Sequence, residues 1–141
     1  MYKHHIVLRM ATRMMTPFIQ LFALYVLAHG EISPGGGFQG GVIFASSFIL
    51  YGIVFGVEEV FKKISRKMIV FLTALGVMIY TGVGYITMFN GGLFLEYAKL
   101  PGLDMKTGNS IGLLLIEIGV FITVFSVMLL LFIEVAKKYD N

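Results

Sequence analysis

Four long apolar runs alternate with short polar segments along the chain, and Glu117 is the only charged residue inside them. An α-helix rises about 1.5 Å per residue, so roughly 20 residues cross the hydrocarbon core of a bilayer. Three runs have this length, and the first reaches it when it is extended back to Ala11, with Arg9 and Arg13 extending to the headgroups. The pattern predicts an all-α integral membrane protein whose four transmembrane helices cover about 11–29, 38–57, 68–89 and 111–133.

The polar segments are too short to form a second domain. None approaches the roughly 40 residues below which a soluble domain needs extra cross-links, so we expect one four-helix domain over residues 1–141. With 57% hydrophobic and 13% charged residues, the composition argues against a water-soluble enzyme. A cleaved signal peptide is the less favoured interpretation of the first run, because no A-x-A-like site follows it.

The basic residues are distributed unevenly between the two sides of the predicted bundle. Nine of the 11 Lys and Arg residues lie before the first run, between the second and third, or after the fourth. Only Lys99 and Lys106 lie in the other loops. Positive residues favour the cytoplasmic side, so both termini are predicted to be cytoplasmic. The net charge of +3 therefore reflects orientation, and no nucleic-acid partner is expected.

Several residues are predicted to end or begin the helices. Two alternatives are open for the start of the first helix. Either Thr16 and Pro17 start it, or the helix begins earlier and Pro17 kinks it. Gly30 ends the first helix, and a tight glycine-rich outer turn leads straight into the second as an antiparallel hairpin. The other predicted boundary residues are Glu58 and Glu59 after the second run, Gly91 and Gly92 after the third, and Asn109 or Ser110 before the fourth.

Small residues recur at helical spacing on the last three predicted helices. In lipid, such stripes allow helix backbones to approach closely, and packing within the bundle is the favoured interpretation. The stripes contain Gly41, Ala45, Gly52 and Gly56, then Thr73, Gly76, Gly84 and Thr87, and finally Gly112, Gly119, Thr123 and Ser126.

Glu117 is the most informative single residue, because a carboxylate within a span costs about 2.5 to 3.5 kcal/mol on insertion scales. It projects about 140° away from Gly112, on the side of Phe121 and Val124. We infer that this side meets a polar cavity or another protein. Two interpretations stay open: a proton or cation relay, and a hydrogen-bonded acid that fixes a helix interface.

Other polar residues give weaker signals. Gln20 is a candidate for a hydrogen bond between helices and, like Glu117, for the ion path. His29 and Glu31 either line an ion entrance, as further ion-path candidates, or are solvated loop positions. The chain has no cysteine, no metal-ligand spacing and no Ser/His/Asp pattern. No catalytic residue, metal or cofactor is expected.

The segment 34–41 combines an aromatic and an amide side chain with glycine pairs. Glycines permit conformations and close approaches that other residues do not, so we predict a partly buried outer turn against a neighbour. Phe38 would be its anchor, and Gln39 would bond exposed backbone. The motif consists of Pro34, Gly35, Gly36, Gly37, Phe38, Gln39, Gly40 and Gly41.

These motifs resemble those of the MnhB/MrpB family, the small four-span subunit of Mrp-type multisubunit cation/proton antiporters. Relatives of that family also occur in the membrane arms of membrane-bound hydrogenases. The family often has Asp at the position of Glu117 and His at that of Glu31, so this chain keeps the first acid and departs at the second. The matching segments are Thr16-Pro17-Phe18, Leu27-Ala28-His29-Gly30, residues 33–41 and Glu117-Ile118-Gly119-Val120.

The resemblance implies a non-catalytic subunit, in a prokaryotic plasma membrane, of a complex that exchanges Na⁺ for protons. Such a subunit packs beside larger antiporter subunits, and a contribution to the ion path is a hypothesis. Two alternatives stay open. The same subunit could serve a redox-driven complex with hydrogenase-type subunits, or the chain could be an independent membrane adaptor or small homo-oligomeric channel.

Overall fold

The computed structural model describes residues 5–139, and the segments in that range with regular structure are helical. Apolar runs bounded by glycine or polar residues form the long helices, as the hydrophobic pattern predicts. The elements are α1 (Ile6–Ala28), α2 (Gly37–Phe55), α3 (Val57–Lys63), α4 (Arg66–Phe89), the 3₁₀ turn η1 (Tyr97–Lys99) and α5 (Met105–Tyr139).

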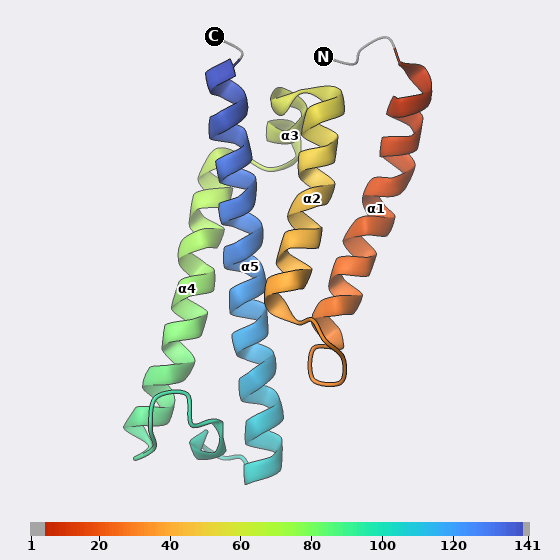
Figure 1. Cartoon of the computed structure of the whole chain (residues 1–141). Helices are drawn as coiled ribbons and strands as arrows, with labels where there is room; N and C mark the ends of the chain where they lie inside the picture. The colour runs from red at the N-terminus through yellow and green to blue at the C-terminus, as the bar shows by residue number, and fades with distance from the viewer. Residues whose placement is uncertain (1–4, 140–141) are drawn as a thin grey trace.

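The long helix α5 lies between α4 and α2, and α1 packs on the far side of α2 (Figure 1). The most extensive contacts join α4 to α5, α1 to α2, and α2 to α5, whereas α1 barely contacts α5. The start of α1, the short helix α3 and the end of α5 lie together at one end of the bundle (Figure 1). The two long loops lie at the other end.

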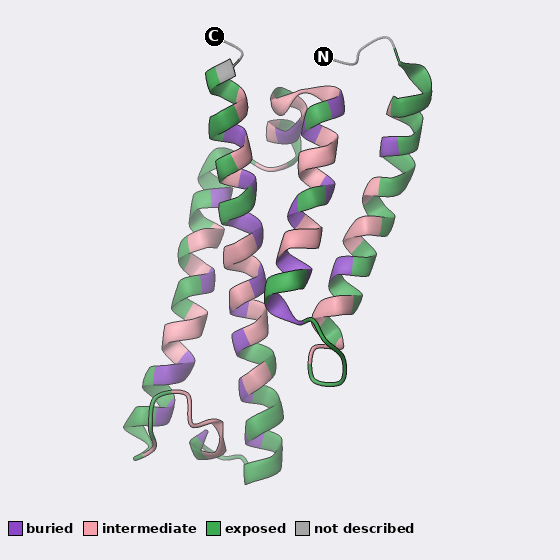
Figure 2. Ribbon diagram, viewed as in Figure 1, coloured by how far each residue is buried: buried purple, intermediate pink, exposed green. Residues whose placement is uncertain are grey.

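Four helices, α1, α2, α4 and α5, are long and apolar enough to cross a membrane. Much of their outer surface is apolar, and Figure 2 shows that α1 is exposed along most of its length. Exposed side chains as large as Phe18 (62%) and Phe71 (61%) would be a liability in water. In a bilayer they face lipid or another membrane protein at no such cost.

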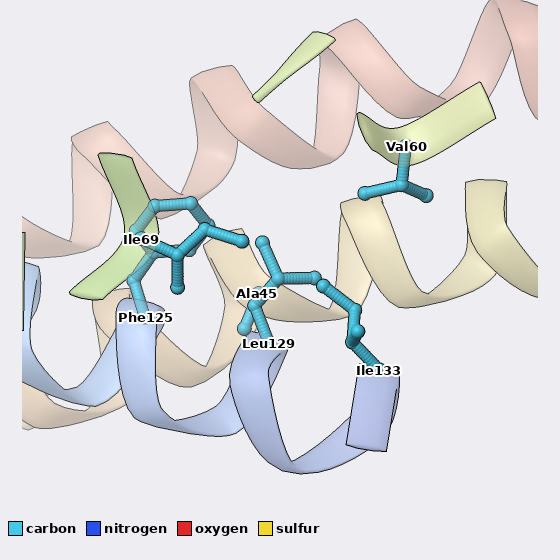
Figure 3. Close-up of a cluster of buried hydrophobic side chains, with 6 residues drawn as sticks. All are labelled: Ala45, Val60, Ile69, Phe125, Leu129 and Ile133. Carbon is cyan, nitrogen blue, oxygen red and sulfur yellow. The ribbon is translucent and has the colours of Figure 1, made fainter. Parts of the chain in front are cut away.

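The buried core lies where α2, α3, α4 and α5 meet, nearer the end that carries α3. Figure 3 shows branched and aromatic side chains from these helices converging there. The small side chain of Ala45 lets α2 approach α5. The cluster consists of Ala45, Val60, Ile69, Phe125, Leu129 and Ile133.

A close helix crossing joins α4 to α5 through two glycines. A Cβ built on Gly119 would lie 3.0 Å from the carbonyl oxygen of Gly76. A Cβ on Gly76 would in turn lie 2.6 Å from the carbonyl oxygen of Gly119 and would overlap the hydroxyl of Thr123. Both backbones therefore approach closely only because neither residue has a side chain, which is the packing that the small-residue stripes predict.

The first helix begins earlier than Thr16, and the prediction that Thr16 caps it is wrong. Helix α1 starts at Ile6, so Arg9 and Arg13 lie within it and Pro17 is internal. The Thr16 hydroxyl donates to the carbonyl oxygen of Thr12 at 2.7 Å. Apolar residues before Arg9 continue the helix towards the headgroup layer, where both arginines can be solvated.

Two further boundary predictions are wrong. Asn109 and Ser110 do not cap α5, because that helix begins at Met105 and both residues lie inside it. Glu58 and Glu59 do not close α2, which ends at Phe55; they belong to the separate helix α3. Gly56, at φ 99°, makes the break between the two helices in a conformation that glycine alone adopts readily.

Candidate functional site

Glu117 lies on α5 and is half-buried against the loop that joins α1 to α2. Residues 117 and 119 are two positions apart, so they project about 200° from each other around the helix. Gly119 faces α4. The side chain of Glu117 accordingly points to the other side of α5, towards the α1–α2 hairpin.

Three glycines of this hairpin, Gly30, Gly36 and Gly37, surround Glu117. A Cβ on Gly36 would lie 2.7 Å from Oε1 of Glu117, and a Cβ on Gly30 would overlap the same carboxylate. A Cβ on Gly37 would overlap the main-chain carbonyl of Glu117. The hairpin therefore contacts both the side chain and the backbone of Glu117, at positions where no larger residue fits without displacement.

The loop around Glu117 depends on glycine for its backbone conformation as well. Gly35 has φ 149° and Gly36 has φ 115°, and Gly36 is the N-cap of α2. The first helical hydrogen bond of α2 runs from Gly40 N–H to the Gly36 carbonyl at 3.0 Å. The N-terminal end of a helix carries partial positive charge, and here that end lies beside an acidic side chain.

The hairpin is shorter than its neighbours at the loop end, so it ends at the level of Glu117. Figure 1 shows α4 and α5 continuing past the α1–α2 loop. From Met105, where α5 starts, to Glu117 is a rise of about 18 Å. On the face of Glu117, Leu114 and Ser110 are exposed along this stretch. The exposed face of α5 beyond the hairpin, which includes Ser110 and Leu114, is called the step, and Glu117 lies where the step meets the hairpin.

Two other predicted ion-path residues lie in the same loop. The Glu31 carboxylate is exposed and close enough to Glu117 for the two negative charges to interact. The His29 ring stacks on Tyr25, with 4.0 Å between the ring centroids. Its Nδ1 donates to the Tyr25 carbonyl at 2.9 Å, which leaves Nε2 as the acceptor when the ring is neutral.

Gln20 lies elsewhere, in a cavity between α1 and α2 towards the end that carries α3. The structure thus brings Glu31 near Glu117, places the His29 ring against Tyr25, and separates Gln20 from the two acids. Among residues 5–139, no group of three or more His, Cys, Asp and Glu side chains has the arrangement of a metal site.

The motif 34–41 divides into an exposed half and a buried half. Pro34, Gly35, Phe38 and Gln39 are exposed, whereas Gly36, Gly37, Gly40 and Gly41 are buried. Gly40 packs against Ala23 and the Phe121 ring, and Gly41 packs against the Phe121 carbonyl. The glycines thus hold α2 close to both α1 and α5, and Phe38 is 63% exposed on the outside.

The contact between Gly30 and the Glu117 carboxylate could not be predicted from the sequence. The sequence predicts that Gly30 ends the first helix and places it in a segment shared with the family; in the structure α1 ends at Ala28, His29 is its C-cap and Gly30 follows. Its contact with the Glu117 carboxylate joins residues 87 positions apart. The only local signal was that a glycine follows the helix immediately, which is common to many helix ends.

Comparison with known proteins gives the family. The family profile described as "Domain related to MnhB subunit of Na+/H+ antiporter" matches residues 7–130. Proteins named "Putative antiporter subunit mnhB2" from Staphylococcus aureus strains Newman and USA300 are 34% identical over 133 residues. The alignment covers 88% of this chain and 94% of each relative.

The matched region contains most of the four helices and every residue around Glu117. The relatives are bacterial, and the four membrane-length helices are apolar outside as well as inside. This is a multi-pass protein of the plasma membrane. With the profile and the relatives agreeing over nearly its whole length, the chain belongs to the family of the MnhB subunit of Na⁺/H⁺ antiporters.

Proposed function

We propose that this chain is a non-catalytic subunit of a sodium/proton antiporter, and that Glu117 lies on the ion path of the complex. The observation that carries the proposal is the placement of this acid in a membrane-spanning helix, against three glycines of the chain's own hairpin. Buried carboxylates in spans mark ion and proton paths when they are not merely paired. The nine-to-two distribution of basic residues supports cytoplasmic termini, with one four-helix domain.

This subunit lacks the polar residues for a complete path of its own. Between Glu117 and Glu134, α5 carries only apolar, glycine and hydroxyl side chains. A proton or cation that reaches Glu117 therefore needs groups from another chain to continue across the bilayer. This argues for a complex and against an independent channel.

The step beside Glu117 supports a neighbouring subunit there. The α1–α2 loop covers one side of the carboxylate, while Leu114 and Ser110 on the same face of α5 stay exposed. A membrane partner seated on the step would complete the shelter of the acid. Phe38 is exposed at the edge of the loop, where it can anchor that partner.

The first experiment is purification of the tagged full chain from its native membrane in mild detergent. We expect several larger membrane proteins to co-purify, identified by mass spectrometry. Recovery of a lone chain that transports sodium by itself would contradict the proposal.

The second experiment replaces Glu117 by Gln, which keeps the size of the side chain and removes its charge. We expect the complex to assemble and sodium-dependent proton exchange in vesicles to fall sharply. Glu117→Ala should also weaken assembly, because the carboxylate fills the space over Gly30 and Gly36. Glu134→Gln, in the same helix but exposed at its other end, is the matched control. Normal exchange in an assembled Gln variant would leave Glu117 a purely structural role.

Phe38→Ala tests the proposed anchor. The side chain is 63% exposed, so the chain's own stability should change by less than about 0.5 kcal/mol. The complex should nevertheless dissociate at lower detergent concentration. Phe71→Ala, on α4 with 61% exposure, is the control. Equal resistance of both variants to detergent would remove Phe38 from the interface.

A further inference from the structure

A polar groove separates α1 from α2 at the end of the bundle opposite the glycine loop. Figure 1 shows α1 leaning away from α2 towards that end. Two adjoining cavities of about 360 and 340 Å³ lie in the gap, and Arg13 and Tyr51 line both. Because they share these residues, the two cavities form one continuous groove.

Three cationic side chains border this groove. Arg9 and Arg13 are four residues apart and therefore share one face of α1. Their guanidinium carbons lie 5.1 and 5.3 Å from the centre of the Phe55 ring. From the other side, Lys63 at the end of α3 places its Nζ 4.8 Å from the centre of the Tyr51 ring. The aromatic rings hold the cations at the rim.

One acid, Glu59, also lines the groove and interacts with Arg13 and Arg9, so it offsets part, but not all, of their positive charge. Its carboxylate accepts a hydrogen bond from Lys62, which holds the pKa of Glu59 below its ordinary value. Glu59 is therefore ionised and engaged by a fourth cation. The groove keeps a net positive charge, at the level where α1 begins and α3 ends.

Deeper in the groove the lining is partly apolar. Pro17 and Phe48 line its inner part, with the amide of Gln20 and the hydroxyl of Thr16 beside them. Cations at the headgroup level above an apolar wall match the two parts of a phospholipid: an anionic phosphate and an acyl chain. We propose that the groove between α1 and α2 binds one anionic phospholipid, with its phosphate between Arg13 and Lys63 and an acyl chain along Phe48.

This proposal is independent of the antiport function, since it rests only on the groove and on the protein spanning a membrane. The bound lipid would fill the gap that α1 leaves and so fix the angle between α1 and α2. A lipid of this kind would act as a structural part of the hairpin that also holds Glu117.

The test uses the full chain in phosphatidylcholine nanodiscs that contain a minor share of phosphatidylglycerol with a photoactivatable acyl chain. After illumination, peptide mapping should place the adducts in α1 and α2 at the groove. The double variant R13Q/K63Q should lose most of this labelling, because each cation near an anionic lipid contributes about a fivefold preference. The control K67Q/K138Q removes two exposed cations at the same end that do not line the groove.

Several outcomes would overturn the proposal. Equal labelling by a photoactivatable phosphatidylcholine would show no role for the anionic headgroup. Equal loss in K67Q/K138Q would indicate general surface attraction. Competition by inorganic phosphate at millimolar concentration would indicate a phosphate site without an acyl chain. If crosslinks in the purified complex join the groove to another subunit and none to lipid, the occupant is a protein. As a check on folding, both double variants should keep the wild-type helical circular dichroism spectrum. If R13Q/K63Q loses that spectrum, the variant R13K/K63R, which keeps both charges, replaces it in the test. Reduced labelling of a folded R13K/K63R would contradict the proposal.

Discussion

Helix α5 is contacted from opposite sides at nearly the same level, and glycines make both contacts. On one side, Gly119 and Gly76 bring the backbones of α5 and α4 together. On the other, Gly30, Gly36 and Gly37 of the α1–α2 hairpin surround Glu117. The first contact is backbone against backbone. The second includes the flexible end of a charged side chain.

The two contacts differ in the atoms that an added side chain would meet. A methyl group added at the α4–α5 crossing meets main-chain atoms, which can yield only if the helices move apart. One added at Gly30 meets a carboxylate that can rotate away. The crossing therefore tolerates substitution poorly. At Gly30 and Gly36, on the Glu117 side, the added methyl group meets the carboxylate first, so we expect a smaller loss of folding free energy there.

A large effect is expected at the crossing between α4 and α5. Gly76→Ala should lower the free energy of unfolding by about 1 to 3 kcal/mol, because its Cβ meets Thr123 and the Gly119 carbonyl. Denaturation in mixed micelles measures the change. Gly82→Ala is the control, since it lies on the same helix with nothing within 4 Å of the added Cβ. Equal effects of the two would mean that the crossing is not close.

Gly37 in the hairpin also packs against a main chain and should behave like the crossing. The Cβ of Gly37→Ala would meet the main-chain carbonyl of Glu117, so we expect a loss of about 1 to 2 kcal/mol. Substituting Glu117 by Ala should not relieve this loss, because the main-chain carbonyl remains. Relief in the double variant, measured by the same denaturation, would contradict the backbone contact.

Gly30→Ala should give a smaller loss, below about 1 kcal/mol, because the added methyl meets only the Glu117 carboxylate. In a double-mutant cycle, Glu117→Ala should remove most of this loss, with a coupling of about 0.5 kcal/mol or more. Sodium-dependent exchange should fall in Gly30→Ala although the protein stays folded. Independent, additive effects would separate Gly30 from the acid.

The smallest effect is expected from the ion pair that also joins α4 to α5. Arg66 donates to Glu134 at 2.8 Å, but both side chains are about half exposed. Arg66→Gln should therefore change the unfolding free energy by less than about 0.5 kcal/mol at physiological salt. A loss as large as that of Gly76→Ala would make charge, and not close approach, the main link between these helices.

The four membrane-length helices could be predicted from the sequence because each needs only an uninterrupted apolar run. Their ends could not, because helices continue into polar segments when no breaker intervenes. Thus α5 begins at Met105, ahead of the apolar run, and α1 begins before Arg9. The break at Gly56 could not be predicted, because a single glycine in an apolar run is equally consistent with close helix packing.

Two parts of the candidate site could be identified from the sequence. Glu117 was identified because an acid inside a span is costly and rare, and the motif 34–41 was identified by its glycines. Their contact with each other was not foreseen. Helical spacing tells which side of α5 the acid faces, but not which of the other helices lies there. The structure supplies that pairing and adds Gly30 to it.

The acid and its glycines also enter the membrane at different times. The hairpin is synthesised before α5, the helix that carries Glu117. Until α5 is inserted, Gly30, Gly36 and Gly37 cannot pack against Glu117. Packing of the acid against these glycines is thus a later event in biogenesis than formation of the hairpin.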